Sequence, residues 1–159
     1  MSAISIKLKD IAYRPFKEVN DSDSKTLTKL SEVVGYPVPS DYLEFLKEFP
    51  NTGIFDADIV CSGIECAPCA ADGLYPISLL YASCSDARYD LLNFRKVSWE
   101  LPAHFLVIGD DIGGNYFCLD LRMESLGKVY FLFHEEGVEA GLYFLANDFS
   151  SFINSLRRQ

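Results

Sequence analysis

The first third of the chain carries one alternating apolar pattern and two helical ones. Residues 2–8 alternate, with Ile4, Ile6 and Leu8 on one side, and this period of two predicts a short strand. Residues 27–34 have apolar positions at helical spacing after a polar run at 20–24, and Gly35 ends that helix. A second helix is predicted from Ser40, a candidate N-cap. Its apolar stripe is Tyr42, Phe45, Leu46 and Phe49.

The middle of the chain is less regular. Residues 54–60 predict a strand, and the Gly- and Pro-containing stretch 61–73 predicts a loop. The apolar stretch 76–81 fits either a strand or an extended lead-in to one. Residues 86–94 predict a short helix with Ser85 as its cap.

The C-terminal half gives the clearest pattern. Strands are predicted at 105–108, 116–121 and 129–133, and the short polar links between them indicate an antiparallel meander. Asn147 and Asp148 are expected to cap a closing helix whose stripe is Phe149, Phe152, Ile153 and Leu156. Arg157 and Arg158 would lie at the C-terminal end of that helix, where its dipole favours cations.

This order of elements predicts the fold class. Helices come first, consecutive strands follow, and a helix closes the chain, which indicates an α+β fold with a central, mostly antiparallel sheet flanked by helices. A length of 159 residues suits one domain, so we expect a single unit over residues 1–159.

The charge balance narrows the choice of partner. The chain carries 14 Lys and Arg against 23 Asp and Glu, a net charge of −9, which repels phosphate backbones and argues against nucleic acid. The acidity either keeps the protein soluble or attracts a basic partner. No targeting signal or apolar run long enough for a membrane span is visible, and the odd number of five cysteines fits reduced thiols, so a cytoplasmic location is expected.

Cysteines are the first candidates for chemistry. Cys66 and Cys69 form a CxxC motif, with Cys61 upstream and Cys84 downstream. Four thiolates can hold zinc, but these cysteines lack the matched spacing of a second pair. A redox role would place the pair at the start of a helix after a strand. The expectation is therefore free thiols and no metal or cofactor, with a zinc or redox site as the alternatives.

Other catalytic patterns are missing from the sequence. The two histidines, His104 and His134, do not form a His-Glu-x-x-His motif, and neither a Gly-x-Ser-x-Gly elbow nor a phosphate-binding Gly-rich loop occurs. The acidic stretch 110–115 lacks the order of a calcium loop and is typical of a hairpin turn. The sequence therefore predicts a binding protein and not an enzyme.

Paired acidic residues remain as candidates for binding a basic protein. They fall at expected loop positions around the sheet, where they can converge into one acidic face. The candidate protein-binding residues are Asp56, Asp58, Asp110, Asp111, Glu135 and Glu136.

The order of several motifs resembles the SUKH superfamily of Smi- and Knr-like proteins. Residues 35–46 match its Gly, Val-Pro and acidic-aromatic helix start, and 51–53 match its Asn-Gly stop, with Thr52 where a second Gly is frequent. Residues 108–120 resemble its Ile-Gly, acidic turn, strand and Asp, with Asn115 where an acid is frequent. The resemblance extends over residues 27–156.

The resemblance implies an α+β fold, no catalytic residues and a role in binding. Bacterial members are chiefly immunity proteins that neutralise polymorphic or contact-dependent toxins, often nucleases, and fungal members act in cell-wall synthesis signalling. The expected partner is therefore a cognate toxin protein of basic charge, with neither nucleic acid nor membrane as a partner. The alternatives are a regulatory or scaffold module without a toxin, and a metal-binding or enzymatic protein.

Overall fold

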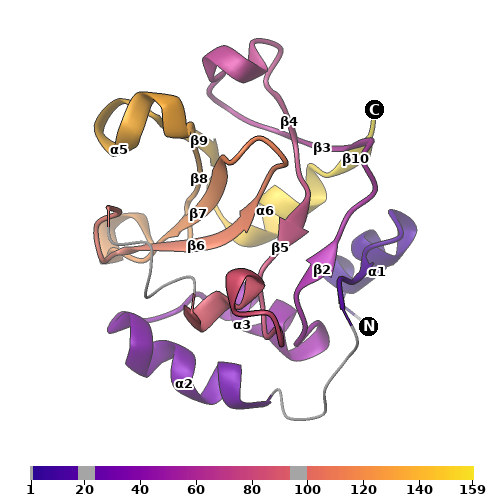
Figure 1. Cartoon of the computed structure of the whole chain (residues 1–159), viewed down its shortest axis with the longest axis vertical. Helices are drawn as coiled ribbons and strands as arrows, with labels where there is room; N and C mark the ends of the chain where they lie inside the picture. Colours follow the sequence, from indigo (N-terminus) through magenta and orange to yellow (C-terminus); the bar gives the residue numbers. More distant parts are fainter. Residues whose placement is uncertain (1, 18–23, 94–99) are drawn as a thin grey trace.

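A computed structural model describes residues 2–17, 24–93 and 100–159 of the chain. Its helices surround a group of strands that run through the centre of the molecule (Figure 1). The described α-helices are α1 (Ala3–Asp10), α2 (Ser24–Val34), α3 (Ser40–Glu48), α5 (Gly137–Ala140) and α6 (Phe149–Asn154). Short 3-10 turns are η1 (Pro68–Ala70), η2 (Ala87–Tyr89), η3 (Met123–Ser125) and η4 (His134–Glu136).

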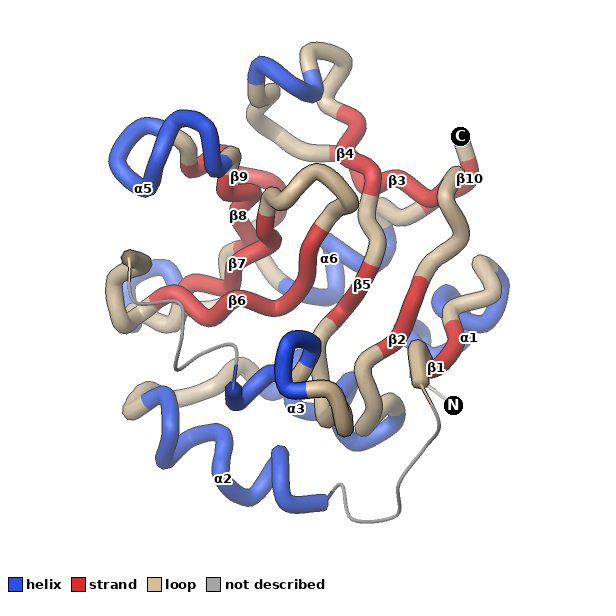
Figure 2. Tube along the Cα trace, viewed as in Figure 1, coloured by secondary structure: helices blue, strands red, loops and turns tan. Residues whose placement is uncertain are grey.

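Within the described residues, the strands form one large and one small antiparallel sheet (Figure 2). The seven-stranded sheet has the order β1-β2-β5-β6-β7-β8-β9. These strands are β1 (Arg14–Pro15), β2 (Gly53–Ile54), β5 (Leu79–Leu80), β6 (Phe105–Asp110), β7 (Tyr116–Asp120), β8 (Val129–Leu132) and β9 (Leu142–Ala146). The three-stranded sheet has the order β10-β3-β4, with β3 (Ile59–Ser62), β4 (Leu74–Pro76) and β10 (Arg157–Arg158).

Helix α6 fills the space behind the large sheet. It contacts α1, α3 and β9, and the three helices lie on the same side of the strands in Figure 1. Phe149 of α6 packs against Tyr42 and Phe45 of α3, and Phe152 packs against Phe117 of β7. All of these rings are buried, so helices and sheet share one apolar core. The predicted α+β class, a large antiparallel sheet flanked by helices, is confirmed.

The two helices predicted from residues 27–34 and 40–49 are confirmed as α2 and α3. Leu30 and Val34 are buried and Val33 is exposed, and Gly35 follows with a φ of 70°, the left-handed conformation that ends many helices. Ser40 is the first residue of α3, and Pro39 holds the N-cap position instead. Of the polar run at 20–24 that precedes this helix, residues 20–23 lie outside the described residues, and Ser24 is the first residue of α2.

The strand predicted at residues 2–8 is wrong, because this segment forms the helix α1. Ile4 and Leu8 are four residues apart and share the buried face, whereas Ile6 is 50% exposed. The Ser2 side chain caps the helix by accepting a hydrogen bond from the Ser5 amide, at 3.1 Å. Because Ile4 and Leu8 fit a period of two as well as a helical period, the pattern alone was ambiguous.

Two predicted strands of the middle region are each divided between the two sheets. Residues 54–60 contain the end of β2 and the start of β3, separated by a turn at Asp56–Asp58. Residues 76–81 contain the end of β4 and all of β5, with Ile77 and Ser78 between them. These strands are too short for the apolar pattern to reveal where one sheet ends and the next begins.

The helix predicted at residues 86–94 is confirmed only in part, because residues 91–93 are α-helical and residues 87–90 are not. Residues 87–89 form the 3-10 turn η2, and Asp86, not Ser85, caps it by accepting a hydrogen bond from the Arg88 amide at 3.1 Å. Phe94 lies outside the described residues. The predicted loop at 61–73 likewise contains the end of β3 and the turn η1.

The predicted meander is confirmed as β6, β7 and β8, which pair antiparallel in sequence order. Asp148 caps α6 as expected, because its carboxylate accepts a hydrogen bond from the Ser151 amide at 2.7 Å. The prediction for Arg157 and Arg158 is wrong: they form β10 and pair with Val60 and Ile59 of β3. The sequence patterns also missed β9, which pairs with β8.

Candidate protein-binding surface

The turn between β6 and β7 is built around the carboxylate of Asp111. One oxygen accepts hydrogen bonds from the amides of Gly113 and Asn115 at 2.8 and 2.9 Å, and the other accepts one from the Asn115 side chain at 2.9 Å. Gly114 has a φ of 85°, a conformation that favours glycine. The predicted hairpin turn is therefore confirmed, with Asp111 as its organising side chain.

Asn115 joins this turn to the next one along the sheet. Its side chain is only 6% exposed, and its carbonyl oxygen accepts a hydrogen bond from the His134 amide at 3.0 Å and lies 2.7 Å from the His134 Nδ1. An amide can donate to Asp111 and accept from His134 at once, which a carboxylate cannot do. The amide thus fixes the hairpin against η4.

Asp110 precedes this turn and is held by a neutral donor. Its carboxylate accepts a hydrogen bond from the hydroxyl of Tyr81, which is buried beside it. Partial burial raises the pKa of Asp110 to about 6; the charge of Asp111 adds to the rise, and the Tyr81 hydrogen bond opposes it. No basic side chain is among the groups that shift it.

Glu135 and Glu136 are exposed on η4, next to the hairpin. Glu136 accepts a hydrogen bond from the Tyr143 hydroxyl of β9 at 2.5 Å. The pKa of Cys69 is raised first by partial burial and then by the charges of Asp111, Glu135 and Glu136, which places all three carboxylates near the CxxC loop. The hairpin and η4 are neighbours, joined by the contact between Asn115 and His134, and both carry acidic side chains.

Asp56 and Asp58 have a different environment, because arginines neutralise them. Arg14 of β1 binds Asp56 at 2.9 Å, and Arg158 of β10 binds Asp56 at 3.1 Å and Asp58 at 2.9 Å. Hydrogen bonds from Arg14 and then Arg158 lower the pKa of Asp56. This cluster joins segments from both ends of the chain to the β2–β3 turn.

The four cysteines considered as zinc ligands do not form a metal-binding group among the described residues. Cys61 is buried in β3, Cys66 and Cys69 are exposed, and Cys84 is partly exposed. Burial raises the pKa of Cys61, and partial burial, followed by the neighbouring acidic charges, raises the pKa of Cys69. Over residues 2–17, 24–93 and 100–159, no group of three or more Cys, His, Asp or Glu side chains is placed to hold a metal ion.

The segment that carries the CxxC motif covers the edge of β9. The amides of Ile64 and Glu65 donate to the carbonyls of Leu145 and Phe144 at 3.2 and 2.8 Å. The Glu65 carboxylate in turn accepts a hydrogen bond from the Phe144 amide at 2.9 Å. An uncovered edge strand invites pairing with other chains, so this loop protects the end of the sheet.

Tyr75 anchors that loop from below. Its buried hydroxyl donates to the Glu65 carbonyl at 2.6 Å and accepts from the Ala67 amide at 2.8 Å. Sequence reasoning missed Tyr75 and Glu65. A tyrosine in a strand predicts a packed ring, but nothing in the pattern indicates which distant backbone its hydroxyl reaches.

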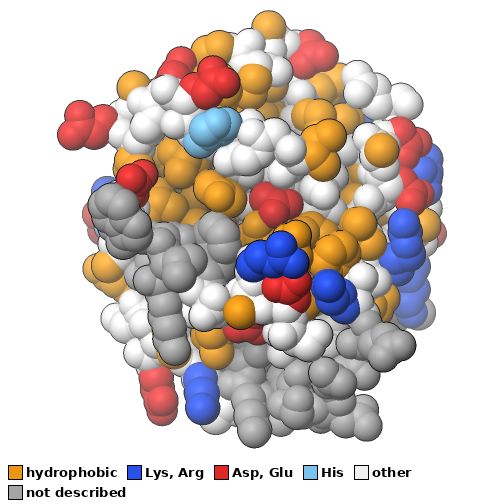
Figure 3. Space-filling view, in the orientation of Figure 1, with side chains coloured by type: hydrophobic (Ala, Val, Ile, Leu, Met, Phe, Trp, Pro, Cys, Tyr) orange, Lys and Arg blue, Asp and Glu red, His pale blue; other side chains and the backbone are white. Residues whose placement is uncertain are grey.

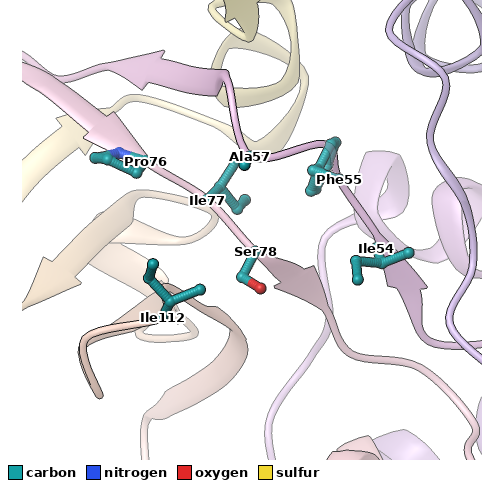
Figure 4. Close-up of a pocket in the computed structure, with 7 residues that line it drawn as sticks. All are labelled: Ile54, Phe55, Ala57, Pro76, Ile77, Ser78 and Ile112. Carbon is teal, nitrogen blue, oxygen red and sulfur yellow. The ribbon is translucent and has the colours of Figure 1, made fainter.

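An apolar groove lies between the β6–β7 hairpin and the strands of both sheets. It has a volume of about 230 Å³. In Figure 4, Ile112 forms one wall, Ile77 and Ser78 lie in the middle, and Ile54 and Phe55 form the opposite wall. Ala57 and Pro76 complete the lining. Figure 3 shows apolar side chains on this face between acidic and basic groups.

Ile112 is the residue of this surface that sequence reasoning passed over. Its side chain is 93% exposed, although it is large, branched and apolar. The sequence feature that could have indicated it is a single isoleucine inside the otherwise polar and glycine-rich stretch 110–115.

These features define a class of protein: a helix-flanked antiparallel-sheet domain that presents acidic and apolar side chains on one surface. The chain belongs to the SMI1 / KNR4 family (SUKH-1), which it matches over residues 22–155. This family includes immunity proteins. The membership predicted from the order of the motifs is thus confirmed.

One relative is the SPbeta prophage-derived uncharacterized protein YokK of Bacillus subtilis (strain 168). It is 24% identical to this chain, and the match covers 96% of this chain and 84% of the relative.

Thr52, where the family pattern often has Gly, is buried and bridges two segments. Its hydroxyl donates a hydrogen bond to the Tyr89 carbonyl and accepts one from the Ala82 amide.

In the part of the chain that the structure describes, no helix is long and apolar enough to cross a membrane.

Proposed function

We propose that this chain is an immunity protein that binds a polymorphic or contact-dependent toxin and neutralises it by protein–protein contact. The observation that carries the proposal is that the contact between Asn115 and His134 brings the hairpin with Asp111 next to η4 with the exposed Glu135 and Glu136, in a family that includes immunity proteins. The partners of Asp111 are backbone amides and an asparagine, and that of Glu136 is a tyrosine, so neither charge is neutralised by these contacts.

The chemistry of the surface favours a basic toxin, and a nuclease domain is the fitting kind. A nuclease needs positive charge to hold phosphates, and carboxylates on a partner protein compete for the same positive groups. A net charge of −9 also speeds the encounter with such a partner. The protein acts by occupying the toxin, without catalysis of its own, in the cytoplasm where the toxin would act.

Co-expression with the product of a neighbouring toxin-like gene tests this proposal. The chain should restore growth of the host and form a complex with the toxin that survives size-exclusion chromatography. Continued killing together with the absence of a complex would reject the proposal. Binding should weaken at higher salt, because exposed charges are screened.

A pair of charge-reversal variants tests the surface itself. Glu135→Lys with Glu136→Lys should reduce protection, because it reverses charge on the proposed surface. The matched control is Glu44→Lys with Glu48→Lys on α3, where both side chains are exposed and the change in net charge is the same. Equal loss in both variants would show that overall charge alone matters.

A further inference from the structure

The Ile112 side chain, which forms one wall of the groove, is not part of the core. The hairpin that carries Ile112 is already fixed by Asp111 and Asn115, and the isoleucine side chain projects from it almost fully exposed. Exposed single apolar residues are common, but this one faces a wall formed by Ile54 and Phe55 across the groove (Figure 4). The result is an apolar recess on a rigid frame.

The size of the groove decides between kinds of occupant. Sites for small organic ligands usually enclose about 300–1,000 Å³ and bury most of the ligand. This groove has about 230 Å³, and one of its walls is the exposed Ile112. It fits one or two side chains of another protein better than a whole small molecule.

The lining of the groove is uncharged, but the acidic residues next to its two walls have different partners. On the hairpin side, Asp110 and Asp111 directly precede Ile112, and their partners are a tyrosine hydroxyl, backbone amides and an asparagine. On the opposite side, Asp56 and Asp58 are paired with arginines. The surroundings of the groove are therefore negative on the hairpin side and close to neutral on the other side, which favours a basic segment lying along the hairpin.

We infer that this groove docks a segment of a partner protein in which an apolar side chain is flanked by Lys or Arg. The apolar side chain enters between Ile112 and Ile54, and the basic neighbours face Asp110 and Asp111. A second copy of this chain is disfavoured, because two molecules of net charge −9 repel each other. The inference deepens the proposed function and rests on it for the identity of the partner.

A peptide titration tests the groove without the toxin. The probe is a short peptide with a central Leu between pairs of Lys, added to full-length protein with labelled isoleucine methyl groups. The methyl signals of Ile112, Ile54 and Ile77 should shift, and those of Ile6 and Ile64 should not. Two comparison peptides, one with Ser in place of Leu and one with Glu in place of Lys, should shift them much less. No shift at millimolar peptide, or equal shifts with all three, would overturn the inference.

Variants then test the groove with the toxin. Ile112→Ala, which removes the exposed wall, and Ala57→Trp, which fills the recess, should each weaken toxin binding about tenfold or more. Met123→Ala is the control, since Met123 is equally apolar and 76% exposed but lies on η3, after β7 instead of before it. If both groove variants still bind the toxin as tightly as the unchanged protein, the groove is not the docking site, and the proposed function stands. If no toxin binds, the proposed function fails and the peptide titration still decides the groove.

Discussion

Two acidic pairs of this protein look alike in sequence and behave differently in the fold. Asp56 and Asp58 lie in a turn after β2, and Asp110 and Asp111 lie at the turn after β6. The first pair binds Arg14 and Arg158, which come from opposite ends of the chain. The second pair binds a tyrosine hydroxyl, amides and an asparagine. Only the second pair keeps its negative charge uncompensated, so counting carboxylates in a sequence overstates the acidic surface.

The largest effect is expected from Asn115→Ala, which removes the amide that holds the second pair in place. The change leaves one Asp111 oxygen and the His134 amide without their partner, and it should cost about 2–3 kcal/mol of unfolding free energy. Urea denaturation measures the change. Asn154→Ala on the exposed side of α6 is the control. A loss no larger than that of the control would show that the hairpin does not depend on Asn115.

The pH dependence of stability should separate the two pairs next. The pKa of Asp110 is raised to about 6 in the folded protein, so the folded state binds this proton more tightly than the unfolded state does. Its contribution to stability therefore increases as pH falls from 7 towards 4. The pKa of Asp56 is lowered, so its contribution has the opposite sign and is lost as pH falls through that lowered pKa.

Two isosteric variants check these signs. Asp110→Asn should remove the gain in stability between pH 7 and about 4, because it removes the titrating group. Asp56→Asn should leave that gain in place and reduce the loss at lower pH. Thermal unfolding over this pH range measures both, and identical profiles for the two variants would contradict the assigned environments.

Tyr81→Phe should have a smaller effect on stability, about 1 kcal/mol, because it removes one hydrogen bond and keeps the ring in the core. The same variant should move the pKa of Asp110 above 6, since the hydroxyl stabilises the charged carboxylate. Carbon NMR of the carboxyl group across a pH titration measures it. A pKa that stays the same or falls would show that the hydroxyl does not act on Asp110.

Arg158→Gln should have the smallest effect on stability, because the ion pairs that it breaks are exposed and screened by water and salt. The expected change is a rise in the pKa of Asp56, incomplete because Arg14 remains bound to it. NMR titration of the carboxyl group tests this. The variant also leaves Asp58 without its arginine and Asp56 with only one. A gain in affinity for a basic partner would show that the arginines normally keep these two carboxylates from binding it.

The sequence predicted the meander β6–β8 and the helices α2, α3 and α6, because each has enough residues to establish its period. It failed where a pattern fits two kinds of structure or where a strand has too few residues to show a pattern. Residues 2–8 fit two periods, and β2 and β5, with two residues each, have no period at all. Their assignment depends on the neighbours with which they pair, such as Leu80 opposite Gly53.

The candidate surface was also predictable only in part, because local patterns are visible in the sequence and contacts between distant segments are not. Turns rich in Asp and Gly are recognisable locally, so the hairpin at 110–115 could be predicted from its residues. The partners of its carboxylates lie far away in sequence, as Tyr81 does from Asp110, and so does the wall that Ile112 faces. Those relations follow from strand order in space.

By itself, the sequence determined the fold class, the family and the overall acidity, because composition, periodicity and motif order are properties of a chain read along its length. The tertiary structure decided which carboxylates are neutralised, how the CxxC segment covers the edge of β9, and that Ile112 faces an apolar groove. Each of these depends on groups distant along the chain meeting in space. Hydrogen bonds, ion pairs and apolar contacts form only between groups a few ångströms apart, so the positions of those groups in the fold set their effects.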